Sequence, residues 1–538
     1  MGSLQTWEQT VSQKRALRDQ ALKPYLVTDI DARSPRVQDV QNLSCFTNDP
    51  LAQEITDIDI IPALVGKLQK GTWTAEQVIR AYIRRAVVAH QITNCITEVI
   101  FDDALVQAQE LDREFERTGR LKGPLHGVPV TVKDQFNVKG HDSTIGCIGR
   151  SFSPATEDAV LVQMLKDMGA VILGKTNLPQ SIMWAETENP LWGLTVNPRN
   201  PALTPGGSTG GEAVLLALDG SILGFGRISV VVFGYPKASW VPTASNLVRF
   251  PYSGVPVSTE GQEHVPSSVG PMARDLASIC YMSLVAESRP WNLDPRCPPL
   301  LWNATAFEDI QSRPMVIGLI IDDGVVKVHP PIERTLCQLA AKLEKSGHEV
   351  VPWDTSDHLG YINLMDQYYT ADGGEDIRRD AAVAGEPFIP HVEALVNRGS
   401  PVSVYEYWQL NRERMDLQKK YLDKWTAARS LSGKPVDVLL SPTMPHVAVP
   451  HRSVRWVGYT KIWNLLDYPA LTFPVDQVRA EDIPLDYGPR NEFDAWNWDL
   501  YDTDVMEGHP VNLQVVGRKL DEERVLGAAT VVERIWRS

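Results

Sequence analysis

Runs of consecutive apolar residues alternate along this chain with stretches in which apolar residues recur at helical spacing. Val128, Val130 and Val132 lead into Lys133 and predict a buried strand. Similar runs predict further strands at residues 170–173, 316–321, 349–353 and 436–440. Helical spacing predicts helices at residues 74–89, 158–168 and 332–345, the first of which begins at a capping box of Thr74 and Gln77. This alternation predicts an α/β fold with a largely parallel or mixed sheet covered on both faces.

Two segments lie outside this alternation. Residues 1–60 are charged and predict a helical N-terminal segment. Residues 481–507 are acidic and carry tryptophans, and we interpret them as a solvated insertion loop rather than a binding surface. The chain contains no internal repeats and no low-complexity tract.

The composition restricts the class of protein. With 538 residues and 43% hydrophobic content the chain can bury a large core. A net charge of −15 disfavours nucleic acid and anionic membranes as partners. No run of about 20 apolar residues could span a bilayer, and the N-terminus lacks the pattern of a secretory signal, so we expect a soluble cytoplasmic protein without membrane partners.

The cysteines and histidines give no sign of a metal site. The six cysteines are scattered along the chain without paired ligand spacing, and the 11 histidines form no metal motif. We therefore expect reduced structural thiols, no metal and no cofactor.

Lys133 and the loop Gly206-Gly-Ser-Thr-Gly-Gly-Glu212 are the most specific chemical signals in the sequence. Cleavage of an amide requires a nucleophilic hydroxyl, a base for its proton and donors for the oxyanion. A lysine can act as that base when burial lowers the pKa of its amine. The glycines allow tight turns around the hydroxyl of Ser208. Each signal alone has an ordinary interpretation, because glycine-serine loops are mostly turns or phosphate cradles and most lysines are solvated.

Together with other motifs these residues resemble the amidase signature family, in particular its fungal acetamidase and general-amidase branch. The matching stretches are residues 174–180, 195–198, 261–264, 267–274, 463–470 and 511–518. The resemblance implies one amidase signature domain over residues 61–538, with a large twisted mixed β-sheet covered by helices on both faces. It also implies a small-molecule amide substrate, favours a small carboxamide over a long-chain lipid amide, and leaves a homodimer open.

The resemblance assigns roles to individual residues. Lys133 and Ser208 belong to a relay that also contains a nucleophilic serine 24 residues after Ser208, and this count falls on Val232 (208 + 24 = 232). Ile182 and its neighbour Met183 are expected beside the acyl group of the substrate.

One stretch departs from the family pattern completely. Where the family has Gly-Thr-Asp-Ile-Gly-Gly-Ser-Ile-Arg-Ile-Pro, residues 226–236 differ at every catalytic feature. The positions expected to bind substrate and form the oxyanion hole are occupied by Ser229, Val230, Val231 and Val232. The nucleophile, the glycines and the following arginine are therefore all absent from the sequence as written.

A shift of reading frame explains this departure. The nucleotides ACGGATATCGGTGGTAGTATTCGGATACC encode the family motif in one frame. Read one base later they encode the residues found here from Arg227 to Tyr235 and begin a proline codon. The match resumes in register at Arg249. We therefore hypothesise two compensating single-base insertions or deletions near residues 227 and 248, whether in the gene or in its reading, and the restored frame has a serine at position 232.

The alternative is that residues 227–248 are a diverged strand and loop. Val230, Val231 and Val232 fit a buried strand. Ser229 is a poor substitute nucleophile, because it lies three residues before position 232. At about 3.3 Å per strand residue, this displacement carries its hydroxyl out of reach of the relay. Two interpretations remain: an active amide hydrolase whose sequence is corrupted at the nucleophile, or a catalytically dead relative that at most binds amides.

Overall fold

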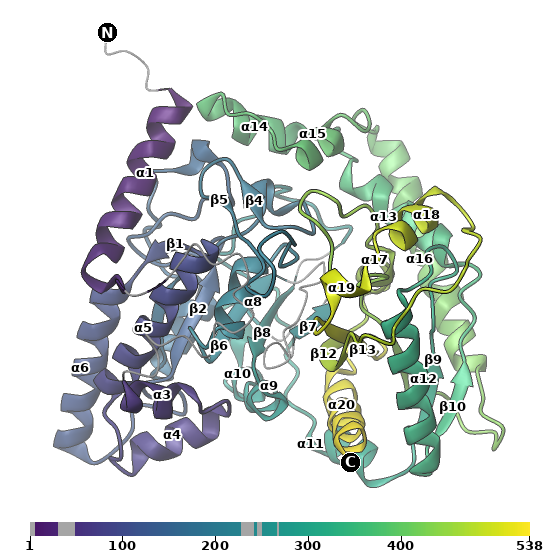
Figure 1. The fold of residues 1–538 in the computed structure, drawn as a ribbon, viewed down its shortest axis with the longest axis horizontal. Coiled ribbons are helices and arrows are strands. Elements are labelled where there is room, and N and C mark those ends of the chain that lie inside the picture. The colour runs from purple at the N-terminus through teal and green to yellow at the C-terminus, as the bar shows by residue number, and fades with distance from the viewer. Residues whose placement is uncertain (1–5, 29, 31–48, 228–240, 245–249, 266–267) are drawn as a thin grey trace.

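The computed structural model describes the chain except for residues 1–5, 29, 31–48, 228–240, 245–249 and 266–267. The described strands form two large sheets and one small ribbon (Figure 1). The first sheet has the order β1 (Ile96–Val99), β3 (Val171–Thr176), β2 (Pro129–Lys133), β6 (Leu223–Arg227) and β8 (Val269–Ala273). The second has the order β10 (Glu349–Pro352), β9 (Val316–Leu319), β11 (Val438–Pro442), β13 (Pro510–Val516), β12 (Ala470–Gln477) and β7 (Val241–Ala244). The ribbon pairs β4 (Glu188–Asn189) with β5 (Gly193–Leu194).

Both large sheets are mixed. In the first, β3, β2 and β6 run parallel, while β1 and β8 are antiparallel to their neighbours. In the second, β10, β9 and β11 are parallel and the pairs from β11 through β7 are antiparallel. β7 and β8 lie beside each other, so the two sheets meet along this seam (Figure 1).

Helices flank both sheets, as the alternating sequence pattern predicts. Around the first sheet lie α1 (Trp7–Leu22), α3 (Pro50–Thr56), α4 (Ile61–Gln69), α5 (Ala75–Thr93), α6 (Phe101–Thr118), α7 (Val160–Asp167), α8 (Gly210–Ala217), α9 (Leu276–Tyr281) and α10 (Ser283–Glu287). The rest of the chain forms α11 (Ala304–Ser312), α12 (Pro330–Lys345), α13 (His358–Tyr369), α14 (Glu375–Ala384), α15 (Pro390–Val396), α16 (Val404–Ala427), α17 (Gly458–Leu466), α18 (Glu492–Asp499), α19 (Thr503–Met506) and α20 (Glu522–Arg537). Single 3₁₀ turns are η1 (Lys23–Tyr25), η3 (Ile148–Arg150), η4 (Gln180–Ile182) and η5 (Pro290–Asn292). The α/β fold with mixed sheets covered by helices is thus confirmed.

The sequence located most of these elements correctly. α5 begins with the capping box of Thr74 and Gln77, in which each side chain accepts from the other residue's backbone amide. The strand that leads into Lys133 is β2, and all five of its residues are buried. The predictions for α7, α12, β3, β9, β10 and β11 agree with the structure to within a few residues at each end.

The interpretation of residues 481–507 as a loop is wrong in part, because this segment contains α18 and α19. Asn491 caps α18 by accepting hydrogen bonds from the amides of Phe493 and Asp494. The carboxylate of Asp494 is buried and accepts the Lys327 amide at 2.6 Å and the Tyr487 hydroxyl at 2.7 Å. Capping and buried polar contacts, rather than hydrophobic periodicity, order this segment.

The N-terminal helix α1 is tied to the first sheet by charge. Lys14 is buried, and its amine lies 2.5 Å from a carboxylate oxygen of Glu98 and 2.7 Å from one of Asp142. The Arg15 side chain donates to the carbonyl oxygen of Leu191 at 2.6 Å. The boundary that the sequence analysis drew at residue 60 stays a prediction. No helix within the described ranges is long and apolar enough to cross a bilayer.

Candidate active site

Strand β2 carries Lys133 at its C-terminal end, and the side chain is fully buried. Its amine donates to the hydroxyl of Ser208 at 2.7 Å and to that of Thr209 at 3.1 Å. Lys133 and Ser208 are 75 residues apart in sequence. The fold therefore brings together the two residues that the sequence analysis selected as the chemical pair.

The loop before α8 presents Ser208 to the lysine. Gly206 has a φ of +89°, a conformation that residues with side chains rarely adopt, and the peptide bond between Gly207 and Ser208 is cis. A Cβ atom on Gly207 would lie 2.6 Å from the amide nitrogen of Glu186. Because that neighbour is backbone, only glycine fits at position 207 without displacing the adjacent chain.

Glu212 forms a second contact between α8 and the sheet, which the sequence analysis missed. Thr131 Oγ1 and Thr176 Oγ1 both donate to its carboxyl, the latter at 2.9 Å. Burial raises the pKa of Glu212 to about 7. Thr131 lies two residues before Lys133 on one face of β2, and Glu212 lies one helical turn after Ser208. The period of two in a strand places Thr131 on the same face as Lys133, and this is the only part of the contact that the sequence signals.

Asp134, which follows Lys133, holds the next loop in place. Its buried carboxylate accepts the Thr97 hydroxyl at 3.0 Å, the Thr144 hydroxyl at 2.7 Å and the Ile145 amide at 2.8 Å. Burial raises the pKa of this carboxyl, and the nearby Lys175 amine and the hydrogen bonds oppose the effect. The backbone around Lys133 is therefore fixed on both sides of the lysine.

Ile182, expected beside the acyl group of a substrate, is buried in an apolar cluster with Ile145, Cys147 and Leu178. Ser181 and Ile182 have φ values of +58° and +66°, an unusual conformation for a β-branched residue such as isoleucine. Residues in such conformations are frequent at ligand sites. The role of Ile182 in substrate binding stays a prediction.

Ser229, Val230, Val231 and Val232 lie outside the described residues. Strand β6 leads directly to this segment. A Cβ atom on Gly226, near its end, would lie 2.5 Å from Cγ2 of Thr209. The described chain therefore ends β6 close to Thr209, which follows Ser208, and the segment expected to hold the nucleophile comes directly after β6 in the sequence.

The aromatic residues between 359 and 425 divide into two groups. Tyr361 and Tyr368 are buried in the hydrophobic core. Tyr405 and Trp408 are exposed on α16.

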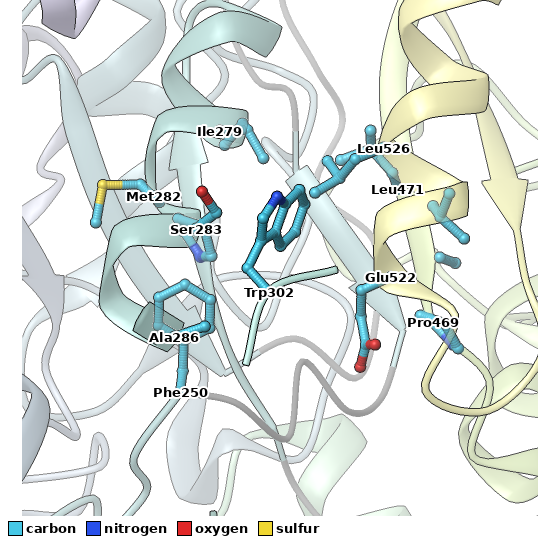
Figure 2. Close-up of a pocket in the computed structure, with 13 residues that line it drawn as sticks. Phe250, Ile279, Met282, Ser283, Ala286, Trp302, Pro469, Leu471, Glu522 and Leu526 are labelled. Atoms are coloured by element: carbon cyan, nitrogen blue, oxygen red, sulfur yellow. The ribbon is translucent and has the colours of Figure 1, made fainter. Parts of the chain in front are cut away.

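A small apolar cavity lies at the seam between the two sheets, between the α9–α10 pair and α20 (Figure 2). Its volume is about 40 Å³, and its lining includes Phe250, Met282, Trp302, Leu471 and Leu526. Neither Lys133 nor Ser208 lines it. Because binding pockets for small molecules usually exceed about 300 Å³, this cavity is a packing void and not the substrate site.

Among the residues that the structure describes, no three His, Cys, Asp or Glu side chains are grouped as ligands for a metal ion. The chemistry that these residues can perform rests on the buried lysine, the hydroxyls around it and the glycine loop.

Comparison with protein families and with individual proteins gives a consistent result. The family model described as Amidase matches residues 77–227 and 245–526. Amidase 1 of Gibberella moniliformis is 53% identical over 516 residues, which cover 94% of this chain and 99% of that protein. An acetamidase of Aspergillus oryzae is 36% identical over 488 residues, which cover 88% of each chain.

A solved structure resembles the whole molecule. A fatty acid amide hydrolase superimposes with a TM-score of 0.89 and 29% sequence identity, covering 99% of this chain and 95% of that one. The match therefore includes both sheets and the helices that flank them.

Proposed function

The chain belongs to the amidase family of amide-hydrolysing enzymes, and we propose that it hydrolyses a carboxamide through an acyl-enzyme formed on a serine at position 232 of the restored reading frame. In this proposal the hydroxyl of the serine at position 232 attacks the amide carbonyl carbon. Ser208 carries the proton of that hydroxyl to Lys133. The proton then returns to the leaving nitrogen as the C–N bond breaks. Water hydrolyses the ester and releases the carboxylic acid. The other product is ammonia or an amine.

The contact between Lys133 and Ser208 carries this proposal. Their 2.7 Å separation allows direct proton transfer, and the lysine is shielded from water. The described part of β6 lies against Thr209 at Gly226, and the proposed nucleophile follows β6 in the sequence. Lys133 is buried and contacts a hydroxyl, so it fits the role of a base, and Ser208 fits the role of a proton carrier. A solvated surface lysine would not be buried in this way.

The interruption in the family match supports the restored frame. The match stops at residue 227 and resumes at residue 245. The omitted residues fall within 227–248, the stretch for which a neighbouring frame encodes the family motif. Divergence by single substitutions would not produce a segment whose nucleotides can encode the family motif when the reading frame is moved by one base.

We propose a small carboxamide as the substrate. The relatives named as amidases and acetamidases support this choice, and they align over most of the chain.

The second candidate function is a protein that binds amides without cleaving them. The observation that favours it is valine at position 232 in the sequence as written. A relay without its nucleophile retains only the small rate enhancement that binding and oxyanion donors provide.

The decisive experiment measures peptide masses across residues 224–254 in the natively expressed protein and sequences the transcript. Peptides containing Gly-Gly-Ser-Ile-Arg would support the proposed hydrolase. Peptides that contain the run from Ser229 to Phe233 would overturn it in favour of the binding protein. Release of ammonia from acetamide and from a long-chain amide then tests the proposed substrate class.

A further inference from the structure

The turn η4 holds two residues other than glycine in the left-handed backbone region. Ser181 and Ile182 have φ values of +58° and +66°, and both are buried. Such residues keep this conformation only where the surrounding contacts fix it, and they are frequent at ligand sites. The contacts that hold η4 therefore decide its conformation.

One set of contacts joins η4 to the end of β2. The Ser181 amide donates to the carbonyl oxygen of Ile145 at 2.9 Å. The Ile145 amide in turn donates to the carboxylate of Asp134 at 2.8 Å, and Asp134 follows Lys133 in the chain. Two hydrogen bonds thus link η4 to the residue next to the lysine.

The chain that leaves η4 supports the loop of Ser208. The Thr187 hydroxyl donates to the carbonyl oxygen of Gly206 at 2.8 Å. Glu186 runs so close to this loop that a Cβ atom on Gly207 would lie 2.6 Å from its amide nitrogen. Since only a few residues separate η4 from these contacts, a displacement of η4 is transmitted to the Ser208 loop as well as to β2.

Gln180, the first residue of η4, fixes the turn to the connection between α14 and α15. Its side chain is buried. Its oxygen accepts the Ile389 amide at 2.8 Å. Its nitrogen donates to the carboxylate of Glu386 at 2.8 Å and to the carbonyl oxygen of Pro387 at 3.0 Å. The acceptor and both donors of the Gln180 amide are then occupied, so this side chain has a single favourable orientation.

Glu386 extends the connection to a second turn, η3. Its other carboxylate oxygen accepts the amides of Ile148 and Gly149, the latter at 3.2 Å. Helix α14 packs against η3, and α14 and α15 lie next to each other along one edge of the molecule (Figure 1). Met183, which follows η4, packs on the apolar cluster that α14 and α15 form. The α14–α15 pair is therefore held on both η3 and η4 by two buried polar side chains.

We propose that Gln180 is a positioning residue for amide hydrolysis, which holds Lys133 and the Ser208 loop in their reactive arrangement by tying η4 to residues 386–389. This inference rests on the proposed function. Gln180 acts through η4 and its neighbours, so its loss should disturb the alignment of the reacting groups more than the binding of the substrate. A misplacement of about 1 Å can lower a rate about 100-fold. The expected signature is therefore a fall in kcat with little change in KM.

Replacing Gln180 by alanine tests this role. In the natively expressed enzyme, Gln180→Ala should lower kcat for acetamide at least about 10-fold while KM changes by less than about 3-fold. Gln91→Ala is the matched control and should retain full kcat, because the Gln91 amide also joins two backbone groups, the N–H and C=O of Val27, both at 3.1 Å. Circular dichroism establishes that both variants are folded. A folded Gln180→Ala protein with unchanged kcat would overturn the proposal.

Exchange of the two side chains tests the pairing of Gln180 with Glu386. Gln180→Glu sets two carboxylates against each other, and Glu386→Gln sets an amide NH₂ group against either the Gln180 amide or the backbone amides of η3. Each single variant should lower kcat. The double variant again joins a donor to an acceptor and should recover kcat in part, since the bond to Pro387 stays lost. A double variant no better than the worse single variant would contradict the pairing.

Hydrogen exchange separates this inference from the proposed function, because the measurement needs no activity. We expect Gln180→Ala, in contrast to Gln91→Ala, to accelerate amide exchange in residues 144–150 and 204–211. A native protein that releases no ammonia from acetamide would refute the hydrolase, while accelerated exchange in both segments would still uphold the link from Gln180 to Lys133 and Ser208. Acceleration confined to residues 386–389 would overturn that link.

Discussion

Thr131 donates a hydrogen bond to Glu212 directly beside the contact between Lys133 and Ser208. Lys133 follows Thr131 by two residues on the same face of β2, and Glu212 follows Ser208 by one helical turn. The two contacts therefore fix the position of α8 on the sheet at two successive points. Four predictions follow from this arrangement and from the segment beyond β6, and a fifth follows from the buried charge on α1.

Removing either member of the proposed relay should abolish hydrolysis without unfolding the protein. In the natively expressed enzyme, Lys133→Ala and Ser208→Ala should each lower kcat/KM at least about 10³-fold, because relay residues act as a unit. Ammonia release from acetamide measures the effect. Lys345→Ala, an exposed lysine at the end of α12, is the control and should retain full activity.

A single substitution should not rescue the sequence as written. Val232→Ser should remain inactive, because the oxyanion glycines and the arginine of the family motif are also absent. Replacing residues 227–248 by the translation of the neighbouring frame should restore hydrolysis to the level of the native protein. Activity of Val232→Ser alone would contradict the frame hypothesis.

Loss of the Glu212 carboxyl should destabilise the protein. Glu212→Ala leaves the buried hydroxyls of Thr131 and Thr176 without this acceptor and opens a cavity, so we expect a loss of about 2–4 kcal/mol. Glu212→Gln keeps an acceptor of the same shape and should lose much less. Urea unfolding of the two variants measures the difference, and equal losses would contradict the assigned hydrogen bonds.

Glu212 should also make stability depend on pH. Its pKa is about 7 in the folded chain against an ordinary value of 4.5. Between these values the folded state holds a proton that the unfolded state has released, so stability falls as pH rises through this window. Relative to Glu212→Gln, the native chain should lose about 3 kcal/mol between pH 4.5 and pH 8. Unfolding curves of both proteins at several pH values isolate the contribution of Glu212 to the pH dependence of stability. The buried histidines change stability with pH in the opposite direction, and they are the same in both proteins.

The buried charge on α1 gives the fifth prediction. Lys14→Met removes the buried cation that pairs with the carboxylates of Glu98 and Asp142, and the loss of one partner of a buried ion pair typically costs about 3–5 kcal/mol. We expect amide hydrogen exchange in α1 to accelerate while exchange in α5 stays slow. Lys23→Met, at an exposed lysine in the turn η1 that follows this helix, is the control. Unchanged exchange in α1 would show that Arg15 and the apolar contacts hold this helix.

The elements were predictable where local patterns determine them. The capping box of Thr74 and Gln77 fixes the start of α5, and the apolar run before Lys133 forms β2. The segment at 481–507 was misjudged because α18 depends on the buried carboxylate of Asp494, which binds the backbone of Lys327 more than 160 residues earlier in the chain. Hydrophobic periodicity contains no information about such a contact.

The sequence by itself determined the family, the α/β fold and the identities of Lys133 and Ser208, because motifs and residue types are local properties of the chain. It also led to the hypothesis of a shifted reading frame from Arg227 to Tyr235, since the genetic code can be applied to the sequence alone. Only the tertiary structure decided that the Lys133 amine lies within hydrogen-bonding distance of Ser208, and that Glu212 is buried between two threonines. It likewise decided that Trp408 faces solvent. Distances and burial arise from the packing of segments far apart in the chain, and no local pattern encodes them.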